Sequence, residues 1–134
     1  MQYAAIDIGT NAARLLVGQV CEENGHSFVK KISYTRVPLR LGEDVFEDSK
    51  ISKQKLENFS KTIQAFKLIS EIRTSLLLIS KNTSNFQFRH KKIQVFWLKK
   101  FPYGIYFIEE DLEIYIIAFW HSKQDIPRKI SKNL

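Results

Sequence analysis

The first half of the chain alternates short apolar runs with polar turns, the pattern of antiparallel strands. Residues 3–8 form one apolar run, residues 9–11 a glycine-containing turn, and residues 12–20 a second apolar run, which together predict a hairpin. Residues 22–25 end in Asn-Gly and predict a tight turn, because these residues tolerate positive φ. A third strand is expected over residues 26–37.

Apolar residues after residue 52 recur at intervals of three and four, which predicts an amphipathic helix. The repeat consists of Leu56, Phe59, Ile63, Phe66 and Ile69. Ser52 is a suitable N-cap, because its side-chain oxygen can accept a hydrogen bond from a backbone N–H of the first turn.

The second half has a different texture. Residues 76–79 continue or restart a helix that ends at the turn cluster of residues 82–85. Strand-like runs follow, at residues 92–98, 103–109 and 113–120, and predict an antiparallel meander. The last run is apolar on both faces and reads as a central strand. The chain therefore predicts an α+β fold in two domains, residues 1–72 and 73–134.

Composition and length favour a small folded protein without a membrane partner. The chain has 134 residues, 44% hydrophobic and 26% charged, which is typical of a globular chain with a modest core. Its apolar runs are of strand length, far below the ~20 residues that cross a bilayer, and no signal peptide is read at the N-terminus. The lone Cys21 reads as a buried apolar residue and excludes an intramolecular disulfide, which suits the cytoplasm.

Positive charge is concentrated in the second half. Residues 1–72 carry 10 Lys/Arg against 9 Asp/Glu, whereas residues 73–134 carry 11 against 5, so the second half supplies +6 of the net +7. No acidic residue lies between Arg73 and Phe107, which favours an anionic partner for this stretch. The alternative is a solvated basic face. The tail from residue 124, with Pro127, is expected to be loosely held.

The first turn carries the residues suited to phosphate chemistry. Gly9 allows close backbone approach to a phosphate, and the N–H groups of Thr10 and Asn11 and the Thr10 hydroxyl can donate to its oxygens. Asp7, at the end of a strand expected to be buried, would hold a divalent metal or orient a water. Arg14 could clamp phosphate with two hydrogen bonds. An ordinary hairpin turn is the alternative interpretation.

The flanking sequence resembles the start of the Ppx/GppA family of exopolyphosphatases and guanosine pentaphosphate phosphatases. The resemblance rests on IDIGTNAARLLVGQV at residues 6–20, RVPLRLGE at residues 36–43 and the helix after them, and it covers residues 1–72. It implies the start of an actin-like, RNase H-like ATPase lobe and a polyphosphate or pppGpp ligand with Mg²⁺. It also implies that the first phosphate-binding loop consists of Asp7, Gly9, Thr10, Asn11 and Arg14, and that Arg40 faces the anion.

The family pattern stops after the predicted helix. A member would continue with a Thr-Ser-Ala-x-Arg stretch, a general-base glutamate and an Asp-x-Gly-Gly-Gly-Ser phosphate loop, none of which is present. Phosphoryl transfer needs positioning and charge neutralisation from both sides of the substrate. We therefore expect a truncated phosphatase-like protein with weak phosphate or Mg²⁺ binding and no meaningful hydrolysis, or inherited residues that bind nothing.

Residues 76–130 resemble the C-terminal part of a RelE/ParE-type toxin. The resemblance rests on LKKFPYGIYF at residues 98–107 and IIAFWH at residues 116–121, although the first strand and helix of that family are replaced by phosphatase-like sequence. It implies an acidic antitoxin, gyrase or mRNA as partner. The candidate partner-binding residues are Arg89, Lys91, Lys92, Lys99, Lys100, His121 and Arg128. The aromatic residues that favour core or antitoxin contacts over base stacking are Trp97, Phe101, Tyr103, Tyr106 and Trp120.

A junction near Ile72 accommodates both resemblances and indicates a chimeric or truncated gene. Such a hybrid predicts two structural blocks. A single sheet that ran through Val20, Val95 and Ile116 would contradict it.

Overall fold

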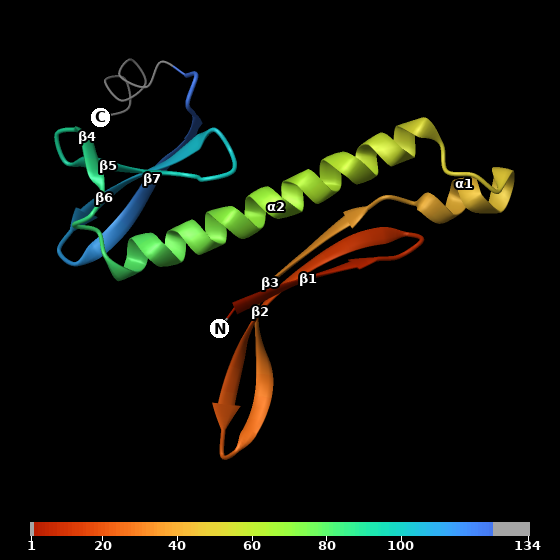
Figure 1. Ribbon diagram of the computed structural model, residues 1–134, viewed down its shortest axis with the longest axis horizontal. Helices are drawn as coiled ribbons and strands as arrows, with labels where there is room; N and C mark the ends of the chain where they lie inside the picture. Colours follow the sequence, from red (N-terminus) through yellow and green to blue (C-terminus); the bar gives the residue numbers. More distant parts are fainter. Residues whose placement is uncertain (1, 125–134) are drawn as a thin grey trace. The chain divides into compact units, whose positions relative to one another are not determined.

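The computed structural model describes residues 2–124 and has an α+β fold of two antiparallel sheets and two helices (Figure 1). The elements are β1 (Gln2–Ile8), β2 (Ala12–Glu23), β3 (His26–Pro38), α1 (Leu41–Asp48), α2 (Lys53–Lys81), β4 (Gln87–His90), β5 (Ile93–Trp97), β6 (Tyr103–Glu110) and β7 (Glu113–His121). The predicted α+β class is confirmed. The expected loose tail, including Arg128, lies outside the described residues.

The chain divides into two compact units, Met1–Ser70 and Glu71–Leu134, whose boundary falls within α2. The first unit contains a sheet in the order β1-β2-β3, and the second a sheet in the order β4-β5-β6-β7. Val20 therefore belongs to one sheet, and Val95 and Ile116 belong to the other. The resemblances of the two units to Ppx/GppA phosphatases and RelE/ParE-type toxins stay predictions.

Local turn chemistry shapes the first sheet. The β1–β2 hairpin keeps one register from Gln2↔Gln19 to Ile8↔Ala13. The β2–β3 turn places Asn24 at φ 51° and Gly25 at φ 76°, the left-handed conformations that a tight hairpin connection requires. The predicted hairpin and turn are both confirmed.

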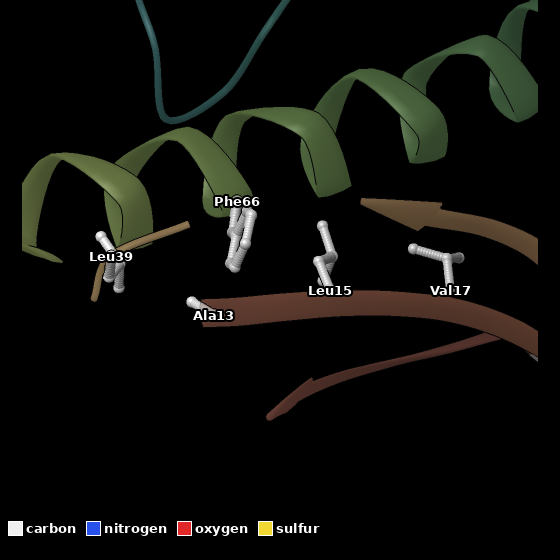
Figure 2. Close-up of a cluster of buried hydrophobic side chains, with 5 residues drawn as sticks. All are labelled: Ala13, Leu15, Val17, Leu39 and Phe66. Atoms are coloured by element: carbon white, nitrogen blue, oxygen red, sulfur yellow. The ribbon is translucent and has the colours of Figure 1, made fainter. Parts of the chain in front are cut away.

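The core of the first unit lies between β2 and α2. Ala13, Leu15 and Val17 alternate along β2 and are buried on the side that contacts Phe66 of α2 (Figure 2). Leu39 closes the same cluster. The helical positions Phe59, Ile63 and Ile69 also pack against it, whereas Leu56 is half exposed.

The helices differ from the prediction in number and in length. The Ser52 hydroxyl accepts a hydrogen bond from the Lys55 N–H at 3.4 Å, which confirms Ser52 as the N-cap. α2 then runs without a break to Lys81, so residues 76–79 continue this helix. α1 is a second helix that the sequence did not predict. It begins directly after Arg40, whose backbone has a left-handed conformation (φ 50°, ψ 41°) and changes the direction of the chain.

The second unit contains a four-stranded sheet, one strand more than predicted. β4 is the added strand, and it pairs with β5. The prediction that residues 113–120 form a central strand is wrong, because β7 pairs only with β6 in the part of the chain that the structure describes and stands at the edge of that sheet. β5 and β6 are central instead, and residues Gly104, Ile105, Tyr106 and Phe107 of β6 are buried.

Two expectations of burial in the first unit also fail. All seven residues of β1 are exposed, so Asp7 does not lie at the end of a buried strand. The reason is that β1 is an edge strand, and the α2 side chains cover the neighbouring β2. Cys21 is partly exposed. Within residues 2–124, no helix is both long and apolar enough to cross a membrane.

Candidate functional site: the β1–β2 loop

The β1–β2 loop is a short, exposed hairpin tip. The Gly9 N–H donates to the Ala12 carbonyl at 3.0 Å, which leaves Thr10 and Asn11 at the tip. Both tip residues are exposed to solvent. The loop is therefore open, as a phosphate-binding loop has to be.

Backbone hydrogen bonds hold this loop against the segment that leads into α1. The Asn11 carbonyl accepts the N–H groups of Leu39 and Arg40, each at 3.0 Å, and the Thr10 carbonyl accepts the Gly42 N–H at 2.8 Å. A Cβ on Gly42 would lie 3.1 Å from the Thr10 Cβ, so glycine permits this close approach. The structure thus brings together two predicted motifs that are distant in sequence.

These bonds also orient the donors of the loop. In a planar trans peptide the carbonyl and the following N–H point in opposite directions. Because the Thr10 carbonyl points at Gly42, the Asn11 N–H points away from α1. Within residues 2–124 nothing accepts a hydrogen bond from this N–H, so it is available to an anion.

Asp7 and Arg14 form a cross-strand ion pair at the base of the loop. They are directly opposite in the β1–β2 register, and an Arg14 guanidinium nitrogen lies 2.6 Å from a carboxylate oxygen of Asp7. The hydrogen bond to Asp7, with a further contribution from Tyr34, raises the pKa of Arg14. The predicted metal ligand and the predicted phosphate clamp are thus bound to each other. A phosphate would have to compete with Asp7 for Arg14.

Arg40 is the more available cation. Its side chain is 71% exposed, and its guanidinium is 3.7 Å from the Glu43 carboxylate, a weaker contact than the Asp7–Arg14 pair. Its backbone N–H is bound to Asn11. Arg40 therefore stands beside the loop with a guanidinium that an anion can reach.

An ion-pair network that sequence reasoning missed anchors α1 to the start of α2. The Lys55 ammonium lies 2.6 Å from Asp44 and 3.2 Å from Glu43, and it also donates to the Arg40 carbonyl at 2.6 Å. Asp44 also accepts the Ser52 N–H at 2.8 Å. The bonds from Lys55 and Ser52 lower the pKa of Asp44 to about 2. No spacing or motif in the sequence indicates these contacts, because they join different elements.

The residues at the loop supply few ligands for a metal. Within residues 2–124 there is no group of three or more His, Cys, Asp or Glu side chains that could hold an ion. Asp7 is a single carboxylate. Magnesium is commonly bound by one or two carboxylates together with substrate phosphates and water. Asp7 therefore fits Mg²⁺ only in company with phosphate oxygens.

A pocket of about 240 Å³ adjoins the other side of the loop and α1. Its lining includes Ile8, Val45, Phe46 and Ile51, and no charged side chain contributes. Phe46 is 86% exposed. This apolar surface does not suit a phosphate, so the candidate anion site comprises the loop tip and the two arginines.

The predicted basic residues of the second unit do not form one patch. Lys91 and Lys92 precede β5, whereas Lys99 and Lys100 follow it, so a five-residue strand of about 17 Å separates the pairs. Lys92 is bound to Glu110 at 3.1 Å. Four exposed lysines are thus divided between two ends of the sheet.

Arg89 and His121 each lie against an aromatic ring. The Arg89 guanidinium is 6.0 Å from the centre of the Trp97 ring, at the limit of a cation–π contact. The His121 ring meets Tyr103 edge-on at 5.0 Å, and its Nδ1 accepts the Lys123 N–H at 3.1 Å. The two residues therefore have structural contacts.

The aromatic residues of the second unit mostly pack with one another. Tyr106 is 1% exposed and contacts Trp97 and Trp120, with ring centres 6.1 Å and 5.1 Å away. Its hydroxyl is buried without a hydrogen-bond partner among residues 2–124, and this burial raises its pKa. Tyr103 stacks on Phe119 at 4.9 Å. Phe101 is partly buried.

Glu71 fixes the β5–β6 loop and was not predicted from the sequence. One oxygen of its carboxylate accepts the backbone N–H groups of Lys99 and Lys100, at 2.5 Å and 2.9 Å. A carboxylate that accepts backbone N–H groups forms strong, charge-assisted hydrogen bonds. The position of the second lysine pair is thus set by an acidic residue.

Comparisons with known proteins assign no family to the chain. No family model matches it. It is similar to the bifunctional 3-dehydroquinate synthase/phosphatase of Fusobacterium nucleatum subsp. nucleatum, with 34% identity over 67 residues, 49% of this chain and 10% of that protein. The chain thus spans about a tenth of the length of the curated relative it matches. Neither result tests the Ppx/GppA or the RelE/ParE resemblance.

Proposed function

We propose that the first unit binds a phosphate group of an anion such as polyphosphate or pppGpp at the β1–β2 loop, weakly and without meaningful hydrolysis. The observation that carries this proposal is the attachment of Thr10 and Asn11 to the segment of Arg40. It gives one exposed site an Asn11 N–H that has no acceptor among residues 2–124, together with an accessible guanidinium. Backbone N–H groups beside an arginine are suitable donors for phosphate oxygens.

The resemblance of residues 1–72 to Ppx/GppA phosphatases supports the same proposal. The chain also matches 10% of a curated protein whose name includes a phosphatase activity. The lone Cys21 is compatible with a cytoplasmic site of action.

The proposed lack of hydrolysis rests on the residues that this sequence supplies. The general base and second phosphate loop of the family have no counterpart in the sequence. With donors on one side of the anion only, the transition state gains little stabilisation beyond that of the bound state. Asp7 would hold Mg²⁺ if the ion were bound, and the ion would supply neutralisation of the phosphate charge.

Isothermal titration of the full chain with tripolyphosphate tests the proposal. We expect binding with a Kd of about 1 mM, near −4 kcal/mol, and a loss of at least about tenfold in Arg40→Ala. Lys30→Ala removes the same charge at the far end of the sheet, opposite Gln19, and serves as the matched control. Equal losses in both variants would mean that net charge alone attracts the anion, and phosphate release would contradict the absence of hydrolysis.

Asp7→Asn distinguishes two roles of the carboxylate. Without Mg²⁺, the variant frees Arg14 from its ion pair, so tripolyphosphate should bind more tightly than to the original chain. With Mg²⁺, the variant should lose any gain that the metal provides. If Asp7→Asn changes binding in neither condition, the anion does not reach the Asp7–Arg14 pair.

The toxin-like alternative stays a prediction for the second unit, with an acidic antitoxin, gyrase or mRNA as partner. The division of the lysines between two ends of β5 gives it no single basic surface. We therefore place the function in the first unit.

A further inference from the structure

β1 is an edge strand without the protection that edge strands usually carry. Among residues 2–124 it pairs only with β2, and all seven of its residues are exposed. Tyr3, Ile6 and Ile8 are large apolar residues with 56%, 45% and 49% of their surface exposed. Natural sheets protect such edges with lysines, prolines, bulges or covering segments, because a free strand edge pairs readily with another strand.

The opposite edge of the same sheet shows that protection. The exposed residues of β3 include Lys30, Lys31 and Arg36, and the strand ends in Pro38. A register shift between Val17 and Gly18 also makes the β2–β3 ladder irregular. β1 has no lysine and no proline, and its pairing with β2 is uninterrupted. A pairing partner would therefore bind at β1.

The hydrogen-bond pattern identifies which groups of β1 face outward. Gly9 and Ala12 form a hydrogen-bonded pair, and such pairs alternate with non-hydrogen-bonded pairs along an antiparallel ladder. Tyr3, Ala5 and Asp7 thus bond to β2. The N–H and C=O groups that point to the free edge belong to Gln2, Ala4, Ile6 and Ile8.

This pattern is complementary to itself. When two β1 strands pair antiparallel about a two-fold axis at Ala5, Gln2 meets Ile8 of the other copy and Ala4 meets Ile6, so every outward donor finds an acceptor. Asp7, the only charged residue of β1, meets Tyr3 and not a second Asp7. Its charge is already matched by Arg14. The small Ala5 side chains meet at the axis, where non-hydrogen-bonded residues approach most closely.

We propose that two copies of this chain pair through β1, antiparallel and about a two-fold axis at Ala5, so that their three-stranded sheets join into one. The shared contact is isologous, since each copy contributes the same strand. Ile6 and Ile8 become less exposed on one face of the joined sheet, and Tyr3 on the other. A second copy is the proposed partner for two reasons. Two antiparallel β1 strands align their outward donors with outward acceptors, and the pairing does not bring two Asp7 carboxylates together.

Sedimentation over a concentration series and site-directed cross-linking test this interface in the full chain. We expect a particle of twice the 15.7 kDa chain mass that dissociates on dilution. In a Cys21→Ser background, Ala5→Cys should form a disulfide-linked dimer on mild oxidation, because the two Cβ atoms across the axis lie near the spacing that a disulfide needs. The control is Val29→Cys, at a β3 residue that is 62% exposed. It should yield at least about tenfold less disulfide-linked dimer.

Two further variants address the edge without relying on the cysteine. Ala4→Pro removes an outward N–H and leaves the bonds to β2 in place, and Ala5→Lys places like charges at the axis; each should weaken the dimer at least about tenfold. Circular dichroism verifies that they fold. A monomer at all concentrations, equal cross-linking through Val29→Cys, or a dimer that Ala4→Pro and Ala5→Lys leave intact would overturn the proposal.

Discussion

The β1–β2 loop and the basic stretch of the second unit both contain residues that the sequence predicts to bind anions. The two sets of residues differ in how the fold arranges them. Three backbone hydrogen bonds hold Thr10 and Asn11 against the segment of Arg40. The lysines of the second unit are instead distributed to the two ends of β5, where Glu110 and Glu71 engage them. Backbone hydrogen bonds thus bring the residues of the first motif together, whereas the lysines of the second unit share only their charge.

The largest effect is expected from the core beneath the loop. Phe66 is 1% exposed among the β2 side chains, so Phe66→Ala should destabilise the first unit by about 3–5 kcal/mol through lost burial and a cavity. Both tryptophans, Trp97 and Trp120, lie in the second unit, so their fluorescence reports on that unit alone. Denaturant unfolding followed by circular dichroism and by tryptophan emission should separate into two transitions, of which only the first moves.

The control for this variant is Phe46→Ala, the same substitution at a residue that is 86% exposed. Its effect should stay within about 0.5 kcal/mol. Equal shifts of both transitions in Phe66→Ala would mean that the two units unfold together. That result would contradict the prediction that the first unit alone is destabilised.

The next effect concerns the lysine pair that follows β5. Glu71→Ala leaves the N–H groups of Lys99 and Lys100 without their acceptor, so the second unit should lose about 1–3 kcal/mol, measured by tryptophan emission during urea unfolding. Glu57→Ala, which removes an exposed carboxylate earlier in α2, should change it little. If the two variants behave alike, Glu71 does not hold this loop.

Tyr106→Phe should stabilise the second unit. The Tyr106 hydroxyl is buried without a partner among the described residues, so its removal abolishes a desolvation cost, a gain of about 1 kcal/mol. Tyr115→Phe is the control, because the Tyr115 hydroxyl is bonded to Glu113 at the surface and its loss brings no gain. A destabilised Tyr106→Phe protein, in a thermal melt, would indicate that the hydroxyl is satisfied in solution.

The smallest effect is expected at the anchor of α1, because Lys55 keeps Glu43 as a partner when Asp44 is neutralised. The pKa of Asp44 is about 2 in the folded chain, below its unfolded value, so the carboxylate contributes stability above about pH 4. That contribution declines as the pH falls from 4 to 2. Asp44→Asn should lack this part of the acid transition, and an unchanged pH profile would show that Asp44 does not contribute.

Elements that depend on neighbouring residues could be predicted from the sequence. The Asn24-Gly25 turn, the strand alternation around Leu15 and the Ser52 N-cap all follow from local chemistry. Strand order could not, because a run that is apolar on both faces, such as β7, does not reveal whether it has one neighbour or two. The exposure of β1 was missed for the same reason.

The candidate site, too, could be predicted only where it depends on neighbouring residues. The residue types of the loop were evident, but the Asp7–Arg14 pair depends on strand register, and the Lys55–Asp44 contact joins two helices. α1 was missed because the segment after Arg40 reads as a turn until the left-handed residue redirects the chain. Contacts between elements thus lie beyond a reading of the sequence.

The most direct test of the central claim is an amide nitrogen–proton correlation spectrum of the full chain during titration with tripolyphosphate. The account predicts that the largest chemical-shift changes occur at the Thr10 and Asn11 amides, with smaller ones at Arg14 and Arg40, and that Lys30→Ala preserves them. Changes centred on Lys91, Lys92, Lys99 and Lys100 with a silent Asn11 would contradict it, and so would a spectrum that does not respond.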